Sequence, residues 1–109
     1  MVDRFEVSFL MDYYLPLLTE KQQNIMEMYY NEDLSLAEIA EINKTSRQAI
    51  HDLIKRCEKQ LLAYENKLNL LQKSLNREKK IIRLLENLRK KHSINEEEYD
   101  MLKEELEDL

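Results

Sequence analysis

The sequence contains no glycine, one proline (Pro16) and one cysteine (Cys57) among its 109 residues. Without glycine, the chain cannot form a glycine-rich phosphate-binding loop and has few ways to build tight turns. A single proline leaves nearly the whole chain free to form helix, so the composition predicts an all-α fold. The lone cysteine excludes an internal disulfide and fits a reducing compartment.

Long uncharged runs are also missing. The longest ones are too short to span a bilayer, and Asp3, Glu6 and Asp12 interrupt the apolar N-terminal segment, unlike a secretion signal. We therefore expect no membrane insertion and a cytoplasmic location. A chain of 109 residues can bury one modest core, with an appendage at most.

Few residues could support catalysis or metal binding. His51, His92 and Cys57 lack the spacing of a zinc site or of a nucleophilic pair. The carboxylates of residues 96–100 fit the positive end of a helix better than a cation site. The sequence thus predicts a protein that is not an enzyme, with no catalytic residue, no metal site and no cofactor.

The net charge of −5 conceals a segregation of charge along the chain. Residues 1–45 carry three basic and nine acidic side chains, residues 46–92 carry thirteen and five, and residues 93–109 carry one and eight. The basic middle would create a local positive field in which a polyanion could bind. The solvated faces of long helices would explain the same pattern equally well.

Capping boxes mark three helix starts, because a Ser or Thr and a Glu or Gln three residues later can satisfy the first amides reciprocally. They are Thr19 with Gln22, Ser35 with Glu38, and Ser93 with Glu96. Before them, the sequence predicts a first helix over residues 3–15, which ends before Pro16. Its apolar residues at helical spacing are Phe5, Phe9, Tyr13, Val7, Leu10 and Tyr14. We expect the N-terminal tyrosines Tyr13, Tyr14, Tyr29 and Tyr30 to pack in the core.

Residues 18–61 fit a helix-turn-helix unit, with a short helix over 35–42, a turn over 43–45 and a second helix from Ser46. At about 100° per residue, the second helix separates an apolar arc from a polar one. The polar arc carries side chains that can bind nucleic acid: Arg can hydrogen-bond guanine, Gln can hydrogen-bond adenine, and Lys can contact phosphate. Ser46 and the free amides of the first turn could bind a phosphate at the positive end of the helix. The candidate nucleic-acid-binding residues are Ser46, Arg47, Gln48, His51, Lys55 and Lys59.

Two observations oppose this interpretation. An ordinary solvated helix face would have a similar composition, and Asp52 lies in the middle of the polar arc. A carboxylate there repels phosphate unless it accepts from a cytosine amine or pairs with Lys55 or Arg56.

The LTEKQ opening, the SLAEIA core and the SRQ helix start resemble the promoter-reading C-terminal region of sigma factors, a sigma region-4-like or winged-helix-like unit. The segment FEVSFLMDYYLPLLTEKQQNIMEMYYNEDLSLAEIAE resembles more closely the YlxM-like family of small bacterial helix-turn-helix proteins. That resemblance implies a regulatory role associated with the signal recognition particle pathway. Lys44 replaces the glycine usual in the sigma turn, so we expect Asn43 to take the left-handed conformation one position earlier.

The second helix continues far beyond the usual end of such a unit. Apolar residues at alternating steps of four and three predict a helix of about 45 Å from Ser46 to Leu75, with a break at residues 74–76. They are Ile50, Ile54, Cys57, Leu61, Tyr64, Leu68, Leu71 and Leu75. Either the C-terminal helices or a second copy would cover this seam, the latter giving a homodimer. We place the helix-turn-helix domain at 1–61 and a helical extension, a bundle or coiled-coil segment, at 62–109.

Two functional hypotheses follow from the sequence and its resemblances. The first is a non-enzymatic regulator that binds nucleic acid, either DNA or signal recognition particle RNA. The second is an adaptor that docks a protein of that pathway through its long helix or acidic tail, without specific DNA reading.

Overall fold

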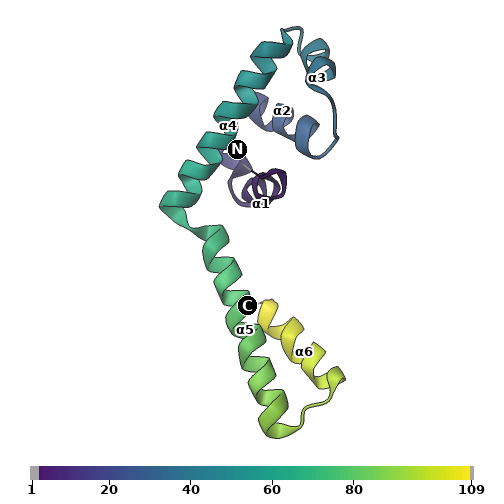
Figure 1. The fold of residues 1–109 in the computed structure, drawn as a ribbon, viewed down its shortest axis with the longest axis vertical. Helices are drawn as coiled ribbons and strands as arrows, with labels where there is room; N and C mark the ends of the chain where they lie inside the picture. The colour runs from purple at the N-terminus through teal and green to yellow at the C-terminus, as the bar shows by residue number, and fades with distance from the viewer. Residues whose placement is uncertain (1–2, 109) are drawn as a thin grey trace. The chain divides into compact units, whose positions relative to one another are not determined.

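All regular structure in the computed structural model, which describes residues 3–108, is helical (Figure 1). The elements are α1 (Arg4–Tyr14), the 3-10 helix η1 (Leu15–Leu17), α2 (Glu20–Tyr30), α3 (Leu36–Ile42), α4 (Arg47–Leu68), α5 (Leu70–His92) and α6 (Glu96–Glu107). The predicted all-α helix-turn-helix fold is confirmed. No strand occurs within residues 3–108, so the likeness to winged helices does not extend to a β-wing. None of the helices described is long and apolar enough to cross a membrane.

The chain forms two compact units, one ending at Leu71 and the other beginning at Gln72. The sequence placed the division at residue 61, but α4 continues to Leu68. The last turns of α4 therefore belong to the helix-turn-helix unit.

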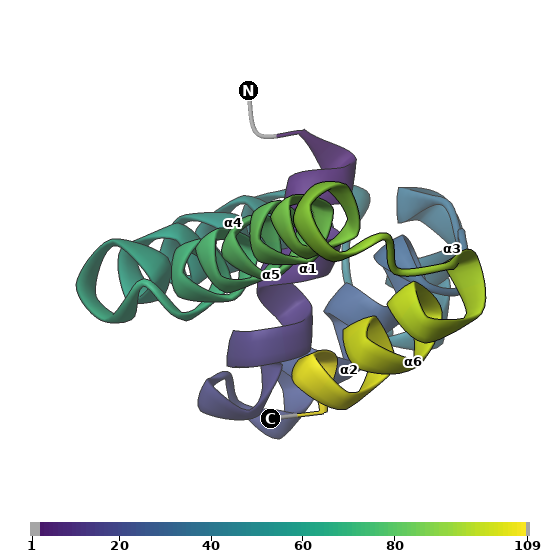
Figure 2. The same ribbon diagram turned by 90° about the horizontal axis from the view of Figure 1, so that it is seen from below.

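The first unit is built around α4, which α1, α2 and α3 cover from one side (Figure 1). Figure 2 shows α1 running across the direction of α4. The buried positions of α4 are Ile50, Ile54, Cys57, Glu58 and Leu61, and the core facing them consists of Val7, Leu10, Met11, Tyr14, Leu18, Ile25, Met26, Ile39 and Ala40. The first half of the predicted seam is thus covered by the N-terminal helices, an arrangement that the sequence did not predict.

Two of the three predicted capping boxes are present. Thr19 Oγ1 accepts from the amide of Gln22 at 3.2 Å, and Ser35 Oγ accepts from the amide of Glu38 at 3.1 Å. The third was misplaced, because Asn95 caps α6 and Ser93 has a φ of 50°. A residue with positive φ lies outside a helix, so α6 begins later than the sequence predicted.

The break after α4 lies at Asn69, before the predicted residues 74–76, and Asn69 has a left-handed φ of 55°. The hydroxyl of Tyr14 on α1 forms hydrogen bonds with residues on both sides of this break. It donates to Glu65 Oε1 at 2.6 Å and accepts from the amide of Leu70 at 3.0 Å. Glu65 Oε1 also accepts from the amide of Leu71 at 3.1 Å. The first amides of α5 are therefore capped by one side chain from the end of α4 and one from α1.

The second unit is a hairpin in which α6 turns back beside the rest of α5 (Figure 1). Its buried apolar residues are Leu85 and Tyr99. The guanidinium of Arg89 lies 4.0 Å from the centroid of the Tyr99 ring, which adds a cation–π contact to this small core.

Loss of the Tyr14 hydroxyl should destabilise the first unit. We expect Tyr14→Phe to lower the free energy of unfolding by about 1–3 kcal/mol, because two partly buried hydrogen bonds of the hydroxyl are lost. Urea unfolding followed by circular dichroism measures this change. Tyr13→Phe is the matched control, since Tyr13 is 38% exposed, and it should change stability by no more than about 0.5 kcal/mol. An equal effect of both changes would contradict the prediction.

The same pair of variants gives a pH test. Burial, and then the hydrogen bond to Glu65, raise the pKa of Tyr14 above its ordinary value of 10.0. A raised pKa of a phenol contributes stability that is present below about pH 10 and is lost as the pH rises beyond it. Tyr14→Phe should therefore lose less stability than Tyr13→Phe between pH 9 and pH 11.

Candidate nucleic-acid interface

The exposed side of the first turns of α4 carries the predicted site. Arg47, His51, Lys55 and Lys59 follow at intervals of four residues, so they form one row along the helix. Arg47, Gln48 and His51 line an open hollow together with Leu36, the first residue of α3. Three of the six predicted residues thus meet in one place, and Lys55 and Lys59 lie one and two turns farther along.

Ser46 is the N-cap of α4, as predicted. Its Oγ accepts from the amide of Ala49 at 3.1 Å, so this oxygen is already used in capping the helix. The hydroxyl hydrogen remains available to an anion at the helix start, where the helix dipole is positive.

Asp52 restrains Gln48, the side chain suited to adenine, and its neighbour His51. Its Oδ1 accepts from Gln48 Nε2 at 2.9 Å and lies 3.4 Å from His51 Nδ1. Neither Lys55 nor Arg56 is among the partners of Asp52 within residues 3–108, so the condition under which its charge would be neutralised is not met. Contact with a base would require Gln48 and His51 to leave the carboxylate.

Lys55 is likewise engaged, with a residue that the sequence interpretation missed. Its Nζ lies 3.4 Å from Oε2 of Glu58, a carboxylate only 6% exposed, and the hydroxyl of Tyr30 donates to the other oxygen. Burial and the hydrogen bond to Glu58 raise the pKa of Tyr30, so the phenol remains a donor. The three-residue spacing of Lys55 and Glu58 could have predicted this ion pair from the sequence. The burial of Glu58 could not be predicted in this way, because it depends on the packing of α2 against α4.

Arg47 and Lys59 differ from Lys55 in having no charged partner. Both side chains are exposed, and neither forms an ion pair or a hydrogen bond with any residue from 3 to 108. They are the two cations of the row that could contact a phosphate without first breaking an internal interaction.

The turn before α4 differs from the expected one. Lys44 has a φ of 54°, whereas Asn43 has a φ of −90°. The amide of Thr45 donates to the carbonyl of Ala40 at 3.0 Å, and the amide of Lys44 donates to that of Glu41 at 3.2 Å. These two bonds form a Schellman motif with Lys44 in the position usually taken by glycine. The turn is thus retained in place, at the steric cost of a left-handed lysine.

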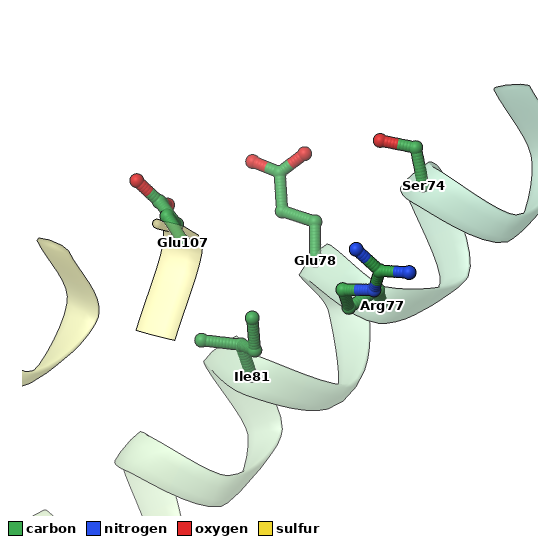
Figure 3. Close-up of a pocket in the computed structure, with 5 residues that line it drawn as sticks. All are labelled: Ser74, Arg77, Glu78, Ile81 and Glu107. Carbon is green, nitrogen blue, oxygen red and sulfur yellow. The ribbon is translucent and has the colours of Figure 1, made fainter. Parts of the chain in front are cut away.

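The structure offers no metal ligands or reactive thiol among residues 3–108. No group of three or more His, Cys, Asp or Glu side chains in this range could hold a metal ion. Burial raises the pKa of Cys57 to about 11, which keeps it a thiol at neutral pH. In the second unit, an open hollow is lined by Ser74, Arg77, Glu78 and Ile81 of α5 and by Glu107 of α6, and its two carboxylates lie on the same side (Figure 3).

A family model described as "Putative helix-turn-helix protein, YlxM / p13 like" matches residues 1–105. The chain belongs to this family, UPF0122. A UPF0122 protein of Clostridium botulinum is 65% identical over all 109 residues, which are also the whole of that relative. One from Clostridium perfringens is 56% identical over all 109 residues, covering 97% of its length. A third, from Clostridium novyi, is 64% identical over 74 residues, which are 68% of this chain and 64% of that protein.

The left-handed Lys44 gives a stability test of the turn in this UPF0122 protein. Lys44→Gly should raise the free energy of unfolding by about 1 kcal/mol, because glycine adopts positive φ without the steric cost of a Cβ atom. Lys21→Gly, in the first turn of α2, is the control and should lower stability by up to about 1 kcal/mol. Thermal unfolding of the two variants measures both effects. A stability loss in Lys44→Gly would show that the turn does not carry this strain.

Proposed function

We propose that this UPF0122 protein is a non-enzymatic regulator that binds nucleic acid through the exposed row of α4. The observation that carries the proposal is the pair of unpaired cations, Arg47 and Lys59, on the same row as His51 and Lys55. Arg47, Lys55 and Lys59 place three cations along one side of a helix, which suits the regularly spaced phosphates of a polyanion. The helix-turn-helix places this row on the helix that such units present to nucleic acid.

The contact is mainly with phosphates, because Gln48, the side chain suited to adenine, is already hydrogen-bonded to Asp52. Such binding depends more on charge than on sequence, and it accommodates either duplex DNA or structured RNA. The YlxM-like resemblance connects the function with the signal recognition particle pathway, and its RNA is accordingly one of the two ligands proposed. As part of the same proposal, the protein acts as a homodimer that presents two such rows.

The alternative is an adaptor that keeps the helix-turn-helix scaffold but docks a protein of that pathway. Asp52 favours this alternative, because a carboxylate at the centre of the face repels phosphate. Nucleic-acid binding and its dependence on Asp52 separate the two functions.

The first test is the loss of either unpaired cation. Arg47→Ala and Lys59→Ala should each weaken binding to duplex DNA and to signal recognition particle RNA, and should reduce the slope of log affinity against log salt by about one. Fluorescence anisotropy at several salt concentrations measures both quantities. Lys21→Ala, an exposed cation on α2, is the matched control and should leave the slope unchanged. Absence of binding to either nucleic acid at low salt would contradict the proposal.

The second test removes the charge of Asp52. Asp52→Asn should strengthen binding about threefold to tenfold, or ~1 kcal/mol, because a charge that repels the phosphates is lost. Asp12→Asn, on α1, is the control for the change in net charge. If Asp52→Asn weakens capture of a pathway protein and leaves nucleic-acid affinity unchanged, the adaptor function is correct instead.

A further inference from the structure

Helix α1 is apolar on two sides, and only one of them is covered within the first unit. Val7, Leu10, Met11 and Tyr14 are buried against the other helices. Phe5, Phe9, Tyr13 and Leu17, which we call the α1 stripe, are 75%, 56%, 38% and 52% exposed. Their spacing by four residues places them in one continuous row that continues into η1. Two exposed phenylalanines in one row mark an interaction surface rather than isolated surface residues.

The charges beside the α1 stripe are acidic. Glu6 lies next to Phe5, and Asp12 lies three residues after Phe9 on the same side of the helix. Arg4 is the only cation of α1, and its side chain is occupied outside the stripe. Its Nη2 donates to Asp33 Oδ1 and to the carbonyl of Tyr29, each at 2.7 Å. Two copies of the stripe facing each other would bring like charges together, so the stripe fits an apolar surface with basic neighbours.

The chain itself carries such a surface on α5. Leu75 and Ile82 are exposed one above the other, seven residues apart, and Lys79 and Arg83 lie on the same side. We call these four residues the α5 surface. Glu86 follows one turn after Ile82 and is paired with Arg89. Residues 72–92 contain eight basic and two acidic side chains. The ion pairs of residues 72–108 are Arg89–Glu86 within α5 and Lys103–Glu107 within α6, so Lys79 and Arg83 are not neutralised by the acidic α6.

We propose that the α1 stripe of one copy docks on the α5 surface of a second copy, and the reverse. The inference rests on the homodimer part of the proposed function and names the surfaces that form it. In a dimer with two such contacts, related by a two-fold axis, neither the stripe nor the α5 surface of either chain is left uncovered. Glu6 and Asp12 then face Lys79 and Arg83, while the phenylalanines pack against Leu75 and Ile82.

The apolar part of the contact is tested by the mass of the whole protein in solution. The chain has a mass of 13.3 kDa, and light scattering after size exclusion should give twice that value at micromolar concentration. The double variant Phe5→Ser, Phe9→Ser should weaken the dimer at least about tenfold. Ile42→Ser is the control, since Ile42 is 55% exposed on α3. Circular dichroism and unchanged nucleic-acid affinity per chain establish that the variants are folded.

The charged part is tested by reversing it on each side separately. A chain with Glu6→Lys and Asp12→Lys, and a chain with Lys79→Glu and Arg83→Glu, should each be monomeric, because both contacts of either homodimer are repulsive. A mixture of the two chains should form a heterodimer, in which both contacts are attractive again. Dimerisation restored only in the mixture is the result expected.

Three results would overturn the inference. They are a monomeric wild-type protein, a dimer that the phenylalanine variant leaves intact, and charge-reversed chains that do not pair when mixed. A monomer that binds nucleic acid would leave the α4 proposal standing, whereas a dimer without nucleic-acid binding would overturn that proposal alone. The two failures are thus distinguishable in the same samples.

Discussion

The first unit depends on the burial of the apolar side of α4 under α1, α2 and α3. Ile50, Ile54, Cys57 and Leu61 share that side because they recur at steps of four, three and four residues. Burying them fixes the rotation of α4 about its axis, and this rotation points the row that begins at Arg47 into solvent. Core packing and the candidate interface are therefore two consequences of one helix orientation.

Carboxylates modify what that interface can do. Asp52, on the polar side of α4, accepts a hydrogen bond from Gln48 and lies beside His51. Glu58, at the edge of the core, forms an ion pair with Lys55. Glu58 can be buried because Tyr30 and Lys55 occupy its two oxygens, which offsets the cost of removing the charge from water. The face therefore combines free cations with cations and amides already bound to acids, which favours contact with phosphates over contact with bases.

The sequence predicted local features of the fold correctly where the interacting groups lie within one helical turn of each other. The capping boxes at Thr19 and Ser35 are of this kind, and both are present. At Ser93 the same pattern failed, because Asn95 offered a competing cap with Glu98 three residues later. The turn of the helix-turn-helix also kept its register against expectation. Lys44 accepts a positive φ because the two Schellman hydrogen bonds hold the chain there.

The sequence by itself determined the helical class, the helix-turn-helix and the row of polar residues on α4, since each follows from periodicity or from short-range spacing. Only the tertiary structure decided which residues hold those side chains and where α4 ends. Tyr14 reaches Glu65 and Leu70, and Tyr30 reaches Glu58, across separations of 28 to 56 residues. No periodic pattern encodes such contacts, because they arise from the way whole helices pack. The exposure of Phe5 and Phe9 has the same origin, for α1 has two apolar sides and packing covers only one.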